Sequence, residues 1–295
     1  MIPDDVLRRR IALPETGIEI AVQDWGGDGP LALLHHANGF CAGMWAPIAE
    51  PLRDRFRVVC MDARGSGDSP VPPGHPDSSA YGWSDMARDV QAVAEALLAE
   101  TGRSSLGLGL GHSFGGTLIM TAEAAHPGLF ERIVAVDPVA PPPPESTANV
   151  PSRAPLLAEM ARRRRSVWPS RAAAREHFAG RELFHSWTEE AIDLYVAEGI
   201  GERADGEVEL KCHPDSEAGV FDGAGRFDVF ARLAGLSAPV LLLWARQGNF
   251  PRAVYERLAA GMQDARIEDV DAGHLVPMEQ PATVLDAVTR FVGAG

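Results

Sequence analysis

Short apolar segments alternate along the chain with amphipathic helical patterns, and this alternation limits the possible folds more than any other feature. Short runs that are apolar on both faces are typical of strands buried inside a parallel sheet. Between them, residues 85–98 carry apolar side chains at the i, i+3, i+4, i+7 spacing of one helix face. Strands and helices in alternation predict a doubly wound α/β fold with right-handed crossovers. The apolar runs are 31–34, 58–61, 106–110, 133–136 and 240–244, and the other helical patterns are 114–126, 252–260 and 281–292.

Three further strands are expected nearer the two ends of the chain. Residues 7–13 and 18–25 form two strand patterns joined by a turn at Glu15-Thr16-Gly17, and in the second pattern apolar residues alternate with others. A short apolar strand is expected near 266–270, before the last helix. The sequence therefore predicts a mostly parallel sheet of eight strands.

One long segment interrupts this rhythm. Pro138 and the prolines at 141–144 follow the strand 133–136, and prolines continue neither a strand nor a helix. From there to about Ser237 the patterns are mostly helical, without a buried-strand run. We therefore expect an inserted helical lid between two parts of an α/β core. The core is 1–140 with 237–295, the lid is 141–236, its expected helices include 171–179 and 188–198, and its arginine run 162–165 is interpreted as a solvated helix face.

Composition excludes several classes of partner. Of the 295 residues, 45% are hydrophobic, enough to bury a substantial core, and the formal net charge of −14 repels nucleic acids and anionic membranes. Cys41, Cys60 and Cys212 are too far apart in sequence for a metal-ligand pair, and their odd number argues against a disulfide framework. No apolar run approaches the ~20 residues that cross a bilayer. We expect a soluble, cytoplasmic monomer or homodimer that acts on a small molecule without a metal or cofactor.

The segment Gly111-His-Ser-Phe-Gly-Gly116 follows one apolar strand and opens a helix. This is the G-x-S-x-G nucleophile-elbow pattern in its strand–turn–helix context. Glycines suit a turn so sharp that side chains at 111 or 115 would collide with neighbouring backbone. Ser113 is the predicted nucleophile, and the N–H of Phe114, at the start of the helix, is a predicted oxyanion donor.

Two histidines compete for the role of general base. His112 adjoins the serine but is interpreted as a structural residue that points the other way, because adjacent side chains diverge at a tight turn. His274 stands on a glycine-flanked loop after the strand 266–270, where it can swing over the serine. His274 is therefore the predicted base.

With these motifs, the chain resembles the α/β-hydrolase fold superfamily over essentially its whole length. The matching pieces are the Gly273-His274 loop, the serine elbow and the segments 33–40 and 62–69. The resemblance implies that residues 36–38 form the oxyanion loop, with a second N–H from Asn38, although Ala37 replaces the usual glycine. It also implies that Arg64 and Asp68 organise a structural turn.

The acid of the expected Ser-His-Asp set is missing from its usual place. Alignment with the superfamily pattern puts Gly248 at the acid position, and no carboxylate stands in the loop 245–251. Asp137 ends the strand that follows the elbow helix, and a right-handed crossover puts this strand beside the serine's strand. Some haloalkane dehalogenases of this superfamily resemble the chain in carrying the acid there. Asp137 is the predicted acid, and the lid carboxylates Glu217 and Asp222 are the alternatives.

A serine nucleophile narrows the reaction. Dehalogenases and epoxide hydrolases of this superfamily require an aspartate, so the resemblance favours acyl transfer from a small, largely apolar ester, thioester or lactone. A carbon–carbon bond hydrolase, a cofactor-free perhydrolase and a weakly catalytic ligand-binding protein share the scaffold and remain alternatives. The residues expected to bind the apolar part of the substrate are Phe40, Met44, Trp168, Phe184 and Trp187.

Overall fold

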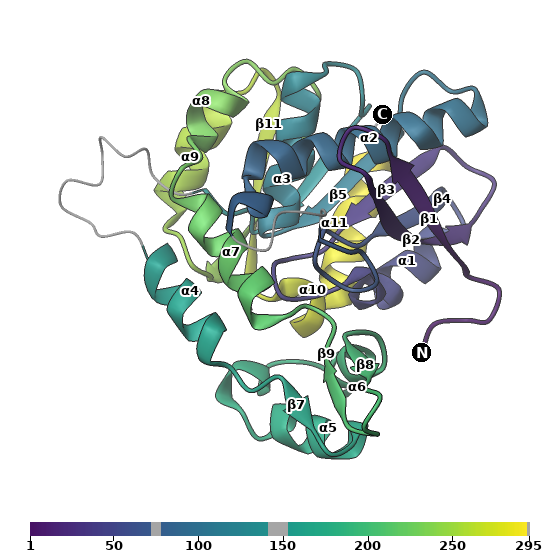
Figure 1. Ribbon diagram of the computed structural model, residues 1–295. Helices are drawn as coiled ribbons and strands as arrows, with labels where there is room; N and C mark the ends of the chain where they lie inside the picture. Colours follow the sequence, from purple (N-terminus) through teal and green to yellow (C-terminus); the bar gives the residue numbers. More distant parts are fainter. Residues whose placement is uncertain (72–77, 141–152, 294–295) are drawn as a thin grey trace.

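The computed structural model describes residues 1–71, 78–140 and 153–293 (Figure 1). The predicted proline break at 141–144 and the first part of the predicted lid lie outside these residues. None of the helices in the described ranges combines the length and the apolar character that a bilayer span requires.

One eight-stranded sheet runs through the molecule. Its strands are β1 (Leu7–Leu13), β2 (Ile18–Gly26), β3 (Leu31–His35), β4 (Arg57–Met61), β5 (Leu108–His112), β6 (Ile133–Val136), β10 (Val240–Gln247) and β11 (Ala265–Gly273). The order is β1-β2-β4-β3-β5-β6-β10-β11, with β1 and β2 antiparallel to their neighbours and every other pairing parallel. The predicted mostly parallel α/β sheet is confirmed. β5 begins two positions later than expected, because Leu106 makes only an isolated bridge to Phe130.

Helices cover both faces of the sheet, and the alternation of side chains along each strand explains the two separate cores. In β3, Ala32 and Leu34 belong to one buried cluster, while Leu31 and Leu33 belong to the other. Helices α1 and α11 pack on the first face, and α2, α3 and α9 on the second. The helices of the core are η1 (Ala42–Trp45), α1 (Ala46–Leu52), η2 (Ser78–Tyr81), α2 (Trp83–Thr101), α3 (Phe114–Ala125), α9 (Arg252–Ala260), α10 (Val276–Glu279) and α11 (Pro281–Gly293).

Residues 153–236, between β6 and β10, are called the insertion below. Most of the insertion is helical, as the sequence predicts, but it also contains a three-stranded antiparallel sheet of order β7-β9-β8. The sequence patterns did not predict these strands, because two or three residues are too few for a detectable period. The elements of the insertion are α4 (Ala154–Arg163), β7 (Val167–Trp168), α5 (Arg171–Ala179), η4 (Glu182–Phe184), α6 (Glu189–Glu198), β8 (Ile200–Glu202), β9 (Val208–Leu210), α7 (Pro214–Ala224) and α8 (Val229–Leu233).

The insertion lies beside the core (Figure 1), and hydrogen bonds and ion pairs join the two, several of them at residues that follow the carboxyl ends of the parallel strands. Lys211 forms an ion pair of 2.8 Å with Asp68, after β4, and the N–H of Thr188 donates to the carbonyl of Met278, after β11. On another side, Arg8 makes two hydrogen bonds of 2.8 Å with Glu198 at the end of α6. The insertion therefore lies against the edge of the sheet at which α/β folds hold their ligands.

Candidate active site

The turn between β5 and α3 holds Ser113 in a backbone conformation that few residues adopt. Its φ of 56° and ψ of −123° depart from the allowed regions for a side chain with a Cβ. The turn is closed by contacts that only glycines permit. A Cβ at Gly111 would lie 2.5 Å from the Cα of Gly116, and a Cβ at Gly115 would lie 2.4 Å from the carbonyl oxygen of His36. The glycines of the elbow motif thus allow the close packing that lifts the serine from the sheet.

Three side chains from distant parts of the chain form a hydrogen-bonded row. The Oγ of Ser113 lies 2.8 Å from Nε2 of His274, and Nδ1 of the same ring lies 2.6 Å from Oδ2 of Asp137. Ser113 is 5% exposed and Asp137 is fully buried, while the His274 side chain retains 19% exposure. When Nδ1–H donates to the carboxylate, Nε2 is free to accept the proton of the serine hydroxyl.

The carboxylate of Asp137 is fixed by two further donors. Its Oδ1 accepts the backbone N–H of Ala245 at 3.0 Å and the hydroxyl of Tyr255 at 2.8 Å. These bonds leave Oδ2 directed at His274. Asp137 has a positive φ of 40°, so its own backbone is constrained where β6 ends. Sequence reasoning missed Tyr255, because nothing in the pattern of α9 distinguishes it from an ordinary core residue.

Gly248 and Asp137 converge on one point in space, although they follow different strands. A Cβ built on Gly248 would lie only 2.5 Å from Oδ2 of Asp137. Any side chain at the superfamily's usual acid position would therefore collide with the carboxylate that occupies the place beside His274. The glycine at 248 and the aspartate at 137 are mutually consistent.

The two alternative carboxylates are engaged elsewhere. Glu217 pairs with Arg164 at 2.5 Å, and Asp222 pairs with Arg162 at 2.5 Å. Within the described ranges, the carboxylate bonded to His274 is that of Asp137. The Arg164 pair also corrects the interpretation of the arginine run as a solvated face, because the side chain of Arg164 is only 23% exposed.

The backbone N–H groups of Phe114 and Asn38 are the predicted oxyanion donors. Phe114 is the first residue of α3, so its N–H has no partner within the helix. The loop that contains Asn38 follows β3, and β3 pairs with β5 through His35 and Gly111. In the part of the chain that the structure describes, neither the N–H of Phe114 nor that of Asn38 donates a hydrogen bond.

Comparison with known proteins identifies the family of the chain. A model of the alpha/beta hydrolase family matches residues 32–287, which is most of the chain. The chain belongs to the alpha/beta hydrolase family. Membership of this family, together with relatives that are named as hydrolases, is consistent with hydrolase chemistry at the site.

Several relatives of this alpha/beta hydrolase have names that describe a reaction. It is 33% identical over 130 residues to fluoroacetate dehalogenase from a Burkholderia species, and it spans 40% of that protein with 44% of its own length. It is 29% identical over 134 residues to 2-(acetamidomethylene)succinate hydrolase from Mesorhizobium japonicum, covering 45% of this chain and 44% of the relative. The chain thus spans less than half the length of these two curated relatives. A crystal structure of E-2-(acetamidomethylene)succinate hydrolase superposes with a TM-score of 0.81 at 23% identity, over 98% of this chain and 99% of that one.

His112 touches the loop of the other histidine in this alpha/beta hydrolase. Its Nε2–H donates to the backbone carbonyl of His274 at 2.8 Å, and the two rings lie 5.3 Å apart. Burial and then the neighbouring His274 lower the pKa of His112 to about 3, so the ring is neutral. His112 is structural, as expected, but it does not point away from the site, because it supports the backbone that carries His274.

Glu279 supports the same loop from the other side. Its carboxylate accepts the N–H of Gly273 at 2.8 Å and that of Leu275 at 3.3 Å. Sequence reasoning missed this residue, although it stands only five positions after His274. The backbone on both sides of His274 is therefore fixed by a side chain.

The turn over 62–69 is organised mainly by a residue that the sequence analysis did not single out. Asp62 accepts the N–H groups of Ala42 and Asp68, and its burial raises its pKa to about 6. Arg64, as expected, has a structural contact, two hydrogen bonds of 2.6 Å to Asp89 in α2. Asp68 contributes its backbone to the turn, while its carboxylate pairs with Lys211 of the insertion.

The aromatic residues expected to bind substrate form one packed cluster with Tyr195. The ring of Phe40 lies 5.6 Å from that of Trp187, which lies 4.6 Å from that of Phe184. Trp168 is fully buried against Phe178, and Met44 is 3% exposed in η1. The position of Phe40 just after the oxyanion loop makes the Phe40–Trp187 end of the cluster the better candidate for contact with substrate.

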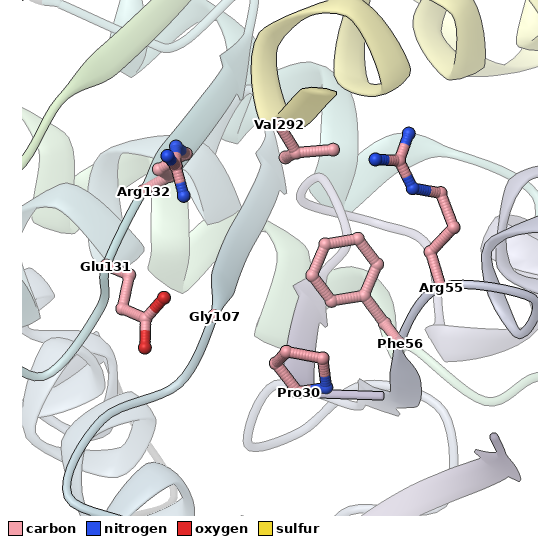
Figure 2. Close-up of a pocket in the computed structure, with 7 residues that line it drawn as sticks. All are labelled: Pro30, Arg55, Phe56, Gly107, Glu131, Arg132 and Val292. Atoms are coloured by element: carbon pink, nitrogen blue, oxygen red, sulfur yellow. The ribbon is translucent and has the colours of Figure 1, made fainter. Parts of the chain in front are cut away.

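A separate cavity of about 230 Å³ lies at the opposite end of the parallel strands (Figure 2). Its lining residues Pro30, Gly107 and Arg132 directly precede β3, β5 and β6, whereas Ser113 follows β5. The cavity is therefore remote from the Ser113–His274 pair and has no part in the candidate site. The other lining residues are Arg55, Phe56, Glu131 and Val292.

Proposed function

We propose that this alpha/beta hydrolase is a serine hydrolase that cleaves a small, largely apolar carboxylic ester, thioester or lactone through an acyl-enzyme. The observation that carries the proposal is the row of Ser113, His274 and Asp137, with distances of 2.8 and 2.6 Å between their polar atoms. In this arrangement a weak nucleophile has a general base, and the base has a buried carboxylate that orients it.

The reaction begins when Oγ of Ser113 attacks the substrate carbonyl carbon. Nε2 of His274 takes the hydroxyl proton, while Nδ1–H stays bonded to Asp137, whose negative charge stabilises the imidazolium. The carbonyl oxygen becomes an oxyanion and accepts hydrogen bonds from the backbone N–H groups of Phe114 and Asn38. The N-terminus of α3 at Phe114 carries the positive end of the helix dipole, which further stabilises the negative charge.

The tetrahedral intermediate then collapses. The bond between the acyl carbon and the leaving group breaks, and His274 gives its proton to the departing alcohol or thiol, or to the alkoxide end of an opened lactone. Water attacks the remaining acyl ester on Ser113, with His274 again accepting a proton. The second collapse releases the carboxylic acid and restores the serine hydroxyl.

Displacement of a halide is disfavoured by the nucleophile itself, in spite of the dehalogenase relative. Attack of a serine oxygen on a saturated carbon would form an ether, which water and a histidine do not hydrolyse. Attack on an acyl carbon forms an ester, which the same groups can hydrolyse. The chemistry of Ser113 therefore supports acyl transfer.

The character of the substrate is proposed from the residues beside the oxyanion loop. Phe40, Trp187 and Phe184 present aromatic carbon rather than charge. A small, apolar acyl or alcohol group that displaces water from the partly exposed ring of Phe40 would gain about 25 cal/mol for each Å² buried.

Cleavage of an acyl–nitrogen bond is the second candidate. The observation that favours it is the name of one relative, 2-(acetamidomethylene)succinate hydrolase, since that substrate carries an acetamido group. The same three side chains would perform it, with His274 protonating the leaving nitrogen. Carbon–carbon bond hydrolysis, perhydrolysis and simple ligand binding have no comparable observation in their favour.

The proposal is tested with p-nitrophenyl acetate and butyrate and with a fluorophosphonate probe. We expect turnover of both esters, labelling of Ser113, and loss of both in Ser113→Ala. Ser105→Ala is the matched control, since the Ser105 hydroxyl donates to Glu131 at the other end of β5. Unchanged turnover or labelling in Ser113→Ala would eliminate the serine-hydrolase proposal, and turnover of N-acetyl anilides but not esters would favour the second candidate.

A further inference from the structure

The oxyanion loop is bonded to side chains of the insertion rather than only to its own core. The hydroxyl of Tyr195, in α6, donates to the carbonyl of Gly39 at 3.2 Å. The side-chain amide of Asn38 donates to the backbone carbonyl of Glu217, in α7, at 2.9 Å. Two helices of the insertion therefore hold Asn38, the last residue of the oxyanion loop, and Gly39, which follows it.

Gly39 is also covered by the carboxylate of Glu217. A Cβ at Gly39 would lie 3.0 Å from Oε1 of Glu217, and the φ of Gly39 is 82°, a value that favours glycine. The backbone at Gly39, directly after the oxyanion loop, thus adopts a conformation that few other residues would permit, against a carboxylate side chain of the insertion.

Arg164, at the end of α4, joins the two helices. One guanidinium nitrogen lies 2.5 Å from Oε2 of Glu217 and another lies 3.0 Å from the hydroxyl oxygen of Tyr195. Because the guanidinium donates to the oxygen of Tyr195, the single hydroxyl proton is left for Gly39. Burial by itself would lower the pKa of Arg164, but Tyr195 and Glu217 raise it above its ordinary value.

This ion pair is mostly buried, with side-chain exposures of 23% for Arg164 and 13% for Glu217. A buried pair is poor evidence for added stability, because the loss of hydration opposes the attraction of the charges. Its better explanation is geometric, since Arg164 donates to the hydroxyl that bonds Gly39, and the backbone carbonyl of Glu217 accepts the side-chain amide of Asn38.

We propose that Arg164, Tyr195 and Glu217 act as a clamp of positioning residues that fixes Asn38 and Gly39, so that the N–H of Asn38 serves as the second oxyanion donor. The inference rests on the proposed function, because it presupposes an oxyanion at Ser113. It assigns to the insertion a part in transition-state stabilisation besides any contact with substrate.

The expected decrease in kcat can be estimated from the known effect of removing an oxyanion donor. Loss of a whole oxyanion donor lowers kcat by about 10²–10³-fold. The clamp variants keep the donor and only loosen its position, so we expect a decrease in kcat of about 10-fold. KM should stay nearly constant, because the oxyanion forms only in the transition state.

The experiment compares Tyr195→Phe and Glu217→Gln with the control Asp222→Asn. The control breaks the Arg162–Asp222 pair, which also joins α4 to α7 but has no contact with the oxyanion loop. We measure kcat and KM for p-nitrophenyl butyrate, and inhibition by butylboronic acid, whose tetrahedral adduct with Ser113 places an oxygen in the oxyanion site. Both clamp variants should lose about 10-fold in kcat and in boronate affinity, while Asp222→Asn keeps both.

Three outcomes would overturn the clamp, and one would overturn the proposed function. Wild-type kcat and boronate affinity in both clamp variants would overturn the clamp, as would an equal decrease in Asp222→Asn or a change confined to KM. If Glu217→Gln fails to fold by circular dichroism, Tyr195→Phe decides alone, because it removes one hydroxyl. A wild-type enzyme without Ser113-dependent turnover would instead overturn the proposed function, and the clamp with it.

Discussion

Replacing Asp137 by asparagine is the sharpest test of the site, because the structure fixes how the new side chain must lie. Oδ1 of Asp137 accepts two hydrogen bonds, from the N–H of Ala245 and the hydroxyl of Tyr255. In Asp137→Asn this position suits only the amide oxygen, since an NH₂ group would face two donors. The amide nitrogen is then directed at His274, at the position that Oδ2 occupies.

A hydrogen-bond donor at this position forces His274 into its other neutral tautomer. Nδ1 of His274 must become an acceptor, which moves the ring proton to Nε2, where it faces Ser113 and cannot take the hydroxyl proton. We expect kcat to fall by about 10³–10⁴-fold, the loss seen when the acid of such a set becomes an amide, equivalent to roughly 4–5.5 kcal/mol in the activation barrier. The fold should persist, because asparagine has the same shape and tolerates a positive φ.

The measurements are kcat for p-nitrophenyl butyrate, the rate of fluorophosphonate labelling, and far-ultraviolet circular dichroism. A matched rescue uses the convergence of positions 137 and 248. In Asp137→Gly with Gly248→Asp, the carboxylate starts from a Cβ 2.5 Å from the former Oδ2 position and should recover at least about 10-fold over Asp137→Gly. A folded Asp137→Asn enzyme whose kcat is within about 10-fold of wild type would refute the assignment of the acid.

Two further predictions follow from buried groups. Tyr255→Phe leaves Oδ1 of Asp137 with one hydrogen-bond donor instead of two. We therefore expect kcat to fall by about 10-fold and the unfolding free energy, measured by urea titration, to fall by about 1–2 kcal/mol. A wild-type kcat would show that the N–H of Ala245 alone orients the carboxylate. Burial lowers the pKa of His36 and His112 to about 3 and that of His35 to about 4, so their contributions to stability are present above pH 6.5 and are lost as the pH falls toward these values. Burial raises the pKa of Asp62 to about 6, so this carboxyl group increases the unfolding free energy as the pH falls below 6. The three histidines together outweigh it, and the unfolding free energy should decrease by about 3 kcal/mol per pH unit below pH 6. Unfolding free energies equal at pH 7 and pH 5 would contradict this balance.

The parts of the fold that sequence predicts well are those with a local pattern. The strand 133–136 and the helix 252–260 have the bounds that their apolar periods predict, because burial on a sheet face or a helix face repeats every few residues. The elbow at Ser113 is likewise predictable, since its glycines are needed for contacts within one turn. The strand β7, of two residues, carries no period and was missed.

The parts that sequence did not predict depend on partners far away along the chain. Arg164 belongs to a run of arginines, and only its packing against Glu217 distinguishes it from its exposed neighbours. Tyr255 follows Asp137 by more than a hundred positions and reaches it because α9 packs on the sheet face near β10. Such contacts are set by the tertiary arrangement, which a pattern of hydrophobic and polar residues does not encode.

The bonds between insertion and core bear on substrate traffic. Swinging the whole segment outward would break the Arg8–Glu198 and Lys211–Asp68 pairs and the buried hydrogen bond from Tyr81 to Ser216 in one movement. It would also release the bonds that reach Asn38 and Gly39 and so dismantle half of the proposed oxyanion site. The contact between the insertion and the core is therefore expected to stay intact throughout turnover. Substrate and product would then enter and leave by rotation of individual side chains, such as Phe40.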